Sequence, residues 1–134
     1  MTMRVELVSP ERILYSGEAD TVIARTIGGG ELAFLTGHTP LVGALDIATV
    51  TIRSSEGDEV VAVHGGFVEV SNDVVTILSD VAELASQIDV ERARQAQQDA
   101  EHRLQQDHDT EAESAARRAH TRLLAAGGLG TASH

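Results

Sequence analysis

Apolar and polar positions alternate through much of the first 85 residues, which is the period of β-strands. The clearest example is Ile47–Arg53 (IATVTIR), which is followed by a predicted hairpin turn at Ser54–Asp58. Further turns are predicted at the triple glycine Gly28–Gly30 and at Ser71–Asp73. Short strands at a spacing of about 8–12 residues, with little helix between them, indicate an all-β sandwich or barrel.

The pattern changes to a helical period in residues 87–126, a stretch without Gly or Pro. Apolar residues recur there at spacings of three and four, at Val90, Ala93, Ala96, Ala100 and Leu104 and again at Ala112, Ala115, Ala119, Leu123 and Ala126. A polar break at Gln105–Thr110 divides this stretch into two helices. Asp89 is the expected N-cap of the first helix, and Gly127–Gly128 the expected end of the second. We therefore expect an antiparallel two-helix hairpin.

The two periods together predict an α+β chain: an N-terminal all-β sandwich followed by a C-terminal helical hairpin. The predicted boundaries are residues 1–85 for the β-sandwich domain, 86–126 for the hairpin domain and 127–134 for a flexible tail.

The seam between the two predicted helices consists mostly of alanine. Each buried methyl group contributes only about 0.8 kcal/mol, and isolated helices of this length are marginal in water. The hairpin should therefore depend on docking, either onto its own sandwich or onto another protein. Such an element can exchange one docking surface for another. A permanently docked hairpin is the alternative.

The net charge of −11 disfavours nucleic-acid binding, because such affinity rests on neutralising phosphates. The charge is uneven, since residues 114–134 carry three arginines and no acid. This basic end suggests contact with something acidic. No apolar run is long enough for a membrane-spanning helix, and the N-terminus lacks a signal-peptide layout, so a cytoplasmic location is the default.

Catalytic and metal-binding signatures are weak in this sequence. The chain has no cysteine, and the spacings of His102, His108 and His120 do not form one helical face, so no metal site is expected. No nucleophile motif accompanies the serines, so we do not expect an enzyme. The run TIGGGELAF lacks the Lys-Ser/Thr of a phosphate loop and is better explained as a turn.

Three arginines form a candidate anion site. Arg118 and Arg122 are four residues apart on one helix face, and an antiparallel hairpin brings them near Arg92 at the start of the first helix. Converging guanidinium groups suit a polyphosphate. The alternative is a set of exposed salt bridges to acids such as Asp89 and Glu91.

The chain resembles the epsilon subunit of bacterial and plastid F-type ATP synthases. The resemblance is carried by GELAFLTGHTPLV (residues 30–42), VHGGFVEVSNDVVTILSDVAE (63–83) and QIDVERA (87–93), in the same order and spacing over nearly the whole chain. It implies a sandwich of about ten strands and a two-helix domain. It also implies a non-catalytic rotor subunit in the central stalk, which contacts the gamma subunit, the c-ring and the alpha/beta catalytic subunits.

The resemblance further implies that the hairpin can extend towards the catalytic subunits and restrain ATP hydrolysis. Arg117, Arg118 and Arg122 would then contact an acidic segment of the beta subunit. The expected location is the cytoplasmic face of the bacterial plasma membrane, or the stromal thylakoid face in a plastid. No cofactor is required. The alternatives are an ATP-sensing module whose hairpin folds on nucleotide, and an unrelated β-sandwich adaptor.

Some family members bind ATP at the folded hairpin, and the matching residues here are Glu83, Ile88, Asp89, Arg92, Arg118 and Arg122. One position departs from the pattern, because Asp99 stands where a basic residue is found and would repel a triphosphate.

The resemblance also implies two contact loops on the sandwich. Glu31 matches an acidic residue that faces the c-ring, and His38, Thr39 and Pro40 in FLTGHTP match the gamma and c-ring contact. Without a second ligand or a nucleophile nearby, His38 is better interpreted as part of a contact surface than as a catalytic base. A simple hydrogen-bonded loop residue is the alternative.

Overall fold

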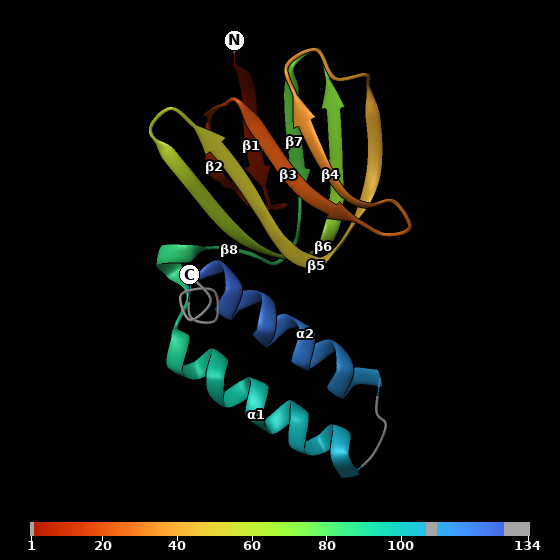
Figure 1. The fold of residues 1–134 in the computed structure, drawn as a ribbon, viewed down its shortest axis with the longest axis vertical. Coiled ribbons are helices and arrows are strands. Elements are labelled where there is room, and N and C mark those ends of the chain that lie inside the picture. Colours follow the sequence, from red (N-terminus) through yellow and green to blue (C-terminus); the bar gives the residue numbers. More distant parts are fainter. Residues whose placement is uncertain (1, 107–109, 128–134) are drawn as a thin grey trace.

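A computed structural model describes residues 2–106 and 110–127, and shows a β-sandwich followed by two helices (Figure 1). The strands in chain order are β1 (Met3–Val8), β2 (Ile13–Ala19), β3 (Thr21–Thr26), β4 (Gly30–Leu35), β5 (Leu41–Ser54), β6 (Gly57–Ser71), β7 (Val74–Leu78) and β8 (Ala82–Leu84). A short 3₁₀-helix, η1 (Ala85–Gln87), and the helices α1 (Val90–Gln106) and α2 (Thr110–Ala125) follow.

The sandwich is one continuous sheet with the strand order β2-β1-β7-β6-β5-β3-β4, in which β8 also pairs with β6. The C-terminal half of β6 pairs with β7, which in turn pairs with β1. The opposite half of β6 pairs with β8, and the C-terminal half of β5 pairs with β3. The long β5–β6 ribbon therefore belongs to both layers of the sandwich.

The ribbon passes between the layers at a bend where its pairing is interrupted. Leu45 pairs with Gly66 and Ile47 pairs with His64, whereas the residues between them on the two strands, Asp46 and Gly65, are not paired. Gly65 and Gly66 have φ values of 88° and 117°, which residues with a side chain rarely adopt. A Cβ on Gly66 would lie 2.1 Å from the carbonyl oxygen of Leu78. The paired glycines therefore allow the ribbon to fold over.

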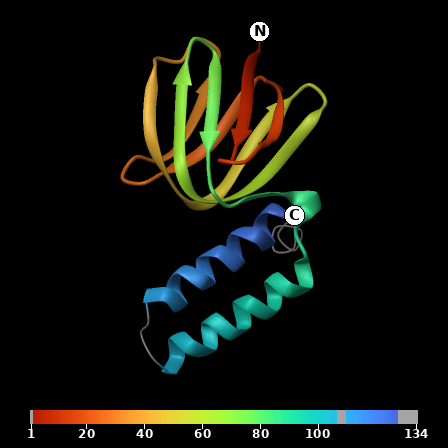
Figure 2. The same cartoon turned by 180° about the vertical axis from the view of Figure 1, so that it is seen from behind.

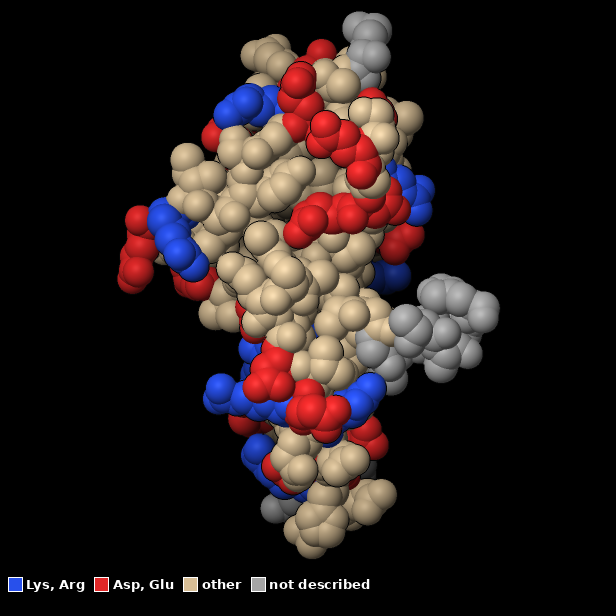
Figure 3. Space-filling model, turned by 90° about the vertical axis from the view of Figure 1, so that its left-hand side faces the viewer, with Lys and Arg blue, Asp and Glu red and all other residues tan. Residues whose placement is uncertain are grey.

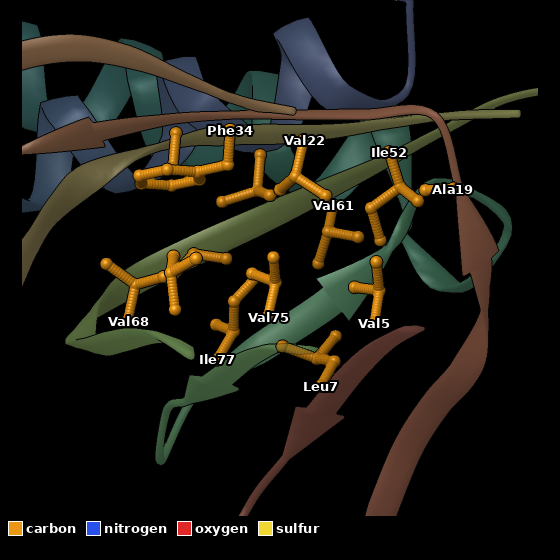
Figure 4. Close-up of a cluster of buried hydrophobic side chains, with 14 of the residues drawn as sticks. Val5, Leu7, Ala19, Val22, Phe34, Ile52, Val61, Val68, Val75 and Ile77 are labelled. Atoms are coloured by element: carbon orange, nitrogen blue, oxygen red, sulfur yellow. The ribbon is translucent and has the colours of Figure 1, made fainter. Parts of the chain in front are cut away.

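The core lies between the two layers, where apolar side chains from facing strands meet (Figure 4). Phe34 is its only fully buried aromatic residue among the described residues, and Val, Ile, Leu, Ala and Met3 supply the rest. The core is therefore poor in aromatic residues and rich in β-branched ones, which pack well on pleated sheet faces.

The predicted turns lie where the sequence placed them. Strand β5 ends at Ser54 and β6 begins at Gly57, and the triple glycine joins β3 to β4. Asn72 and Asp73 both have positive φ, at 51° and 61°, as a two-residue type I′ hairpin turn requires.

The predicted fold class, a β-sandwich followed by a helical hairpin, is confirmed. The described residues form eight strands where about ten were expected. The difference arises because β5 and β6, of 14 and 15 residues, run unbroken through both layers. The division into domains at residue 85 remains a prediction, and residues 128–134 of the predicted tail lie outside the described residues.

Helix α2 lies between α1 and the sandwich (Figures 1 and 2). The buried residues of the two helices are Ala93, Ala100, Ala112, Ala119, Thr121, Leu123 and Ala125. The predicted N-cap is confirmed, since Asp89 Oδ1 accepts the Arg92 amide at 3.1 Å. Helix α2 ends at Ala125, and Gly127, two residues beyond it, has a φ of 79° that is typical of a glycine after a helix. No helix in the described part of the chain is long and apolar enough to cross a membrane.

The substitution Gly66→Ala should destabilise the sandwich by at least about 2 kcal/mol, because it combines a strained φ with a backbone clash. Gly43→Ala is a matched control in β5, since a Cβ there meets side chains only at 3.5 and 3.7 Å. Urea unfolding of both variants measures the difference. Equal stability of the two variants would contradict this account of the bend.

Candidate functional site

Among the described residues, a small apolar cluster and two ion pairs join the hairpin to the sandwich. The docking cluster consists of Ala62, Ile88 and Ala125, with Val60 and Ala126 packed against it. It joins β6, the segment before α1 and the end of α2. Because most of its members are alanine or valine, its burial contributes only a few kcal/mol.

The first ion pair joins Arg117 on α2 to Asp46, which lies at the bend of β5. Asp46 Oδ1 also accepts the Ile47 amide at 2.8 Å. Burial works against ionisation of this carboxyl, but the bond from Arg117, the Ile47 amide and the charge of Arg25 outweigh it and lower the pKa of Asp46. The bend of the ribbon thus presents a stable negative charge to the helix above it.

The second ion pair joins Arg122 on α2 to Glu83 on β8, with 2.6 Å between Nε and Oε1. His64 Nε2 lies 3.1 Å from the same carboxylate oxygen. Burial again opposes ionisation, but the hydrogen bonds from Arg122 and His64 lower the pKa of Glu83. Burial of the imidazole, with a further effect of the Arg122 charge, lowers the pKa of His64.

A cavity of about 400 Å³ opens beside this second ion pair, between the base of the hairpin and β8. Its lining residues are Glu83, Gln87, Asp89, Arg92, Ala93, Ala96 and Arg122. Two acids and two arginines line it, so their formal charges cancel. An anion that binds there must therefore compete with the acids for the arginines.

The structure brings together four of the six predicted nucleotide-site residues. Glu83, Asp89, Arg92 and Arg122 line the cavity. The other two lie elsewhere: Ile88 is buried in the docking cluster, and Arg118 donates to Glu111 Oε1 at 2.7 Å.

Asp99, the departure from the family pattern, accepts a hydrogen bond from Gln95 at 3.0 Å on α1. It is not among the residues that line the cavity.

The three arginines predicted to contact a partner are all engaged within the chain. Arg117 pairs with Asp46, Arg118 with Glu111 and Arg122 with Glu83. On the face shown in Figure 3, basic and acidic side chains lie side by side over the helical part of the molecule. Each pair is at least partly exposed, so each contributes about 0–1 kcal/mol and can be exchanged for another.

The predicted contact loop at residues 36–40 is tightly held. The Gly37 amide donates a hydrogen bond of 2.7 Å to Oδ1 of Asp73, which lies in the turn between β6 and β7. His38 Nδ1 lies 2.6 Å from the Thr39 carbonyl oxygen, and its ring packs edge-on against Phe34 at 5.1 Å. Thr39 and Pro40 are exposed beside it.

The structure does not bring Glu31 to this loop. Glu31 lies at the start of β4 and His38 just beyond its end. A strand of six residues separates them by about 20 Å. The two predicted contacts therefore lie at opposite ends of β4.

An exposed apolar face covers the outside of β5, β6 and β7. Ala44 lies opposite Phe67, and Phe67 lies opposite Leu78. Val42 lies two residues from Ala44 and therefore on the same face of β5. Ile27 lies next to Ala44, because the Ile27 amide donates a hydrogen bond of 2.9 Å to the Ala44 carbonyl oxygen. Phe67 and Val42 are 57% and 71% exposed. We call these five residues the outer apolar face; such faces commonly mark protein contacts.

Asp46, His64 and Asp73 were not singled out from the sequence. Asp46 and His64 flank the bend, so only the β5–β6 register places them under the hairpin. Asp73 was recognised as a turn residue, but its bond to Gly37 spans 36 positions. Among the residues that the structure describes, no three His, Asp or Glu side chains gather as metal ligands.

The described residues thus define a two-part protein, a β-sandwich that carries an appended helical hairpin joined to it by ion pairs. Residues 2–85 match the model of the ATP synthase delta/epsilon chain β-sandwich domain. The chain belongs to the ATP synthase delta/epsilon family.

Similar proteins are named ATP synthase epsilon chain. The one from Halalkalibacterium halodurans is 46% identical over 94% of this chain and 98% of its own length. The one from Streptomyces coelicolor is 43% identical over 94% of this chain and 96% of its own length. The predictions of the family and of a non-catalytic ATP synthase subunit are thereby confirmed.

A solved structure shares the fold. A chain in the Euglena gracilis mitochondrial ATP synthase, determined with OSCP, F1 and c-ring, aligns with a TM-score of 0.71 and 23% identity, over 99% of this chain and 82% of that chain.

The substitution Ile88→Ala should weaken docking of the hairpin by about 2 kcal/mol, because Ile88 is the largest side chain of the docking cluster. Amide hydrogen exchange should then accelerate in α1 and α2 while β1 and β7 keep their protection. Leu124→Ala, on the same hairpin but 41% exposed, should change little. Equal acceleration in the sandwich and the helices would show that the hairpin does not open separately.

Proposed function

We propose that the chain is a rotor subunit in the central stalk of an F-type ATP synthase, at the cytoplasmic face of the bacterial plasma membrane. In this role it couples proton-driven rotation to ATP synthesis and restrains ATP hydrolysis through its hairpin. The observation that carries the proposal is the docking of α2, which rests on a small apolar cluster and two exchangeable ion pairs.

The sandwich supplies the proposed fixed contacts with the other rotor subunits. The outer apolar face and the rigid loop around His38 are suited to a large partner such as the gamma subunit, because the face is apolar and the loop is held by Asp73. Glu31, about 20 Å away along β4, is suited to a second partner, the c-ring. Two partners, one at each end of β4, would account for the separation of these residues.

The hairpin supplies the proposed movable contact with the alpha/beta catalytic subunits. While it is docked, Arg117, Arg118 and Arg122 are paired with acids of the chain itself. Undocking frees Arg117 and Arg122, which can then pair with acidic side chains of the beta subunit. The two positions are therefore mutually exclusive, and their free energies differ by little because one set of ion pairs replaces another.

Deletion of residues 87–134 should leave assembly with the other rotor subunits intact and raise the ATP hydrolysis rate of the complex, because the proposed brake is removed. Deletion of residues 128–134 alone is the control. Both complexes are compared with wild type by steady-state ATPase assays after purification through another subunit. An unchanged hydrolysis rate would remove the inhibitory role, whereas failure to copurify would remove the proposed stalk position.

ATP sensing is a second proposed function, supported by the cavity at the base of the hairpin. Arg92 on α1, Arg122 on α2 and Glu83 on β8 line that one cavity, so a ligand within it would touch both helices and the sandwich. Such a ligand stabilises the docked hairpin by linkage. Because the formal charges of the lining residues cancel, we expect weak binding.

Arg92→Ala should weaken ATP binding by about ten- to a hundredfold, as expected for the loss of a charged hydrogen-bond donor. Arg94→Ala is the matched control, because Arg94 lies on the same helix but pairs with Glu91 outside the cavity. Titration calorimetry at millimolar ATP measures both. The absence of binding heat with the wild-type chain would contradict ATP sensing.

A further inference from the structure

One carboxylate oxygen between the hairpin and the sandwich has two nitrogen partners. Glu83 Oε1 lies 2.6 Å from Arg122 Nε and 3.1 Å from His64 Nε2. Glu83 and His64 both belong to the sandwich, on the paired strands β8 and β6. Arg122 belongs to α2 and leaves when the hairpin undocks. The sandwich therefore keeps a carboxylate and an imidazole in contact in either position of the hairpin.

The surroundings of His64 favour its neutral form while the hairpin is docked. Its side chain is only 3% exposed, and Nδ1 is buried with no hydrogen-bond partner among the described residues. A neutral ring with its proton on Nε2 donates to Glu83 and leaves only an unpaired acceptor at Nδ1. Protonation would put a buried N–H at Nδ1 without an acceptor, at a cost in free energy.

The charges around His64 come from two neighbouring elements. Glu83 on β8 attracts a proton to the ring, whereas Arg122 and Arg118 on α2 oppose it. The residue opposite His64 on β5 is Ile47, which carries no charge. The two opposing charges both lie on the hairpin, so they are removed from His64 when the hairpin undocks.

We infer that protonated His64 replaces Arg122 as the counter-ion of Glu83, so that mild acidification releases the hairpin from the sandwich. The inference rests on the proposed mobility of the hairpin and adds that a proton bound by His64 controls this mobility. The proposed regulator is thus the proton, which binds at His64, away from the outer apolar face.

The direction of the pH effect follows from linkage. Burial lowers the pKa of His64, and so do the charges of Arg122 and Arg118 on α2. Because undocking removes those two charges, the docked form binds fewer protons than the undocked form. Docking is therefore strongest at pH values where His64 is neutral in both forms, and it weakens as the pH falls and the undocked form takes up a proton, by up to about tenfold in the equilibrium constant for each pH unit. The carboxyls of Glu83 and Asp46, whose pKa values docking lowers, act only in a more acidic range.

The absence of native cysteine allows a direct distance measurement. Cysteines placed at the exposed positions Ser55 on the β5–β6 turn and Gln98 on α1 carry a fluorophore pair in the full-length chain without nucleotide. For the wild-type background, the label separation should change as the pH falls from 8 to 5.5. His64→Gln keeps an N–H donor but cannot titrate, so it should remain docked throughout; His64→Asn provides a second such variant. His120→Gln, on α2, is the control and should behave as wild type.

Three outcomes separate this inference from the mobility on which it rests. Opening of the wild type that His64→Gln and His64→Asn both abolish supports the inference. Opening that persists in both variants, or that His120→Gln abolishes, overturns it. A wild-type hairpin that stays docked at pH 5.5 also overturns the inference. The Asp46→Asn/Glu83→Gln double variant, which removes both ion pairs, then tests mobility separately: if it opens at pH 8, the hairpin is mobile. If that double variant also stays docked, the proposed mobility fails as well.

Discussion

The bend in the β5–β6 ribbon is the constraint on which the rest of the structure depends. Because Gly65 and Gly66 adopt backbone conformations that a Cβ would prevent, one long hairpin can serve both layers of the sandwich. The fold brings Val68 and Val75 of one layer against Val22 and Ile52 of the other (Figure 4). It also sets the two bend-flanking polar residues, Asp46 and His64, beneath α2, so the same geometry builds the core and the docking surface.

Docking of the hairpin is weak for a reason that lies in side-chain size. An alanine seam lets α1 and α2 approach closely, but it buries little apolar area. The ion pairs between α2 and the sandwich are partly exposed, so their strength is limited by solvent screening. A larger apolar surface would hold α2 permanently. The composition of the helices therefore suits an element that moves between two partners.

The sequence predicted the elements better than the contacts between them. Strand and helix periods located the sandwich, the hairpin and the Asp89 cap, since these are local properties. Local spacing also placed Arg118 and Arg122 on one face, yet only Arg122 reaches the cavity, because Arg118 turns to Glu111. The pairing of His64 with Glu83 and of Asp46 with Arg117 depends on register and docking over 19 and 71 positions, which no local period encodes.

Arg122 is the point at which the proposed functions compete. Its guanidinium is held by Glu83 in the docked hairpin, lines the cavity proposed for ATP and belongs to the set proposed to contact the beta subunit. These roles make opposite demands on the hairpin: a cavity ligand requires it docked, whereas the contact with the beta subunit requires it undocked. By linkage, a cavity ligand must therefore oppose the contact with the beta subunit, and a protonated His64 that satisfies Glu83 must favour it.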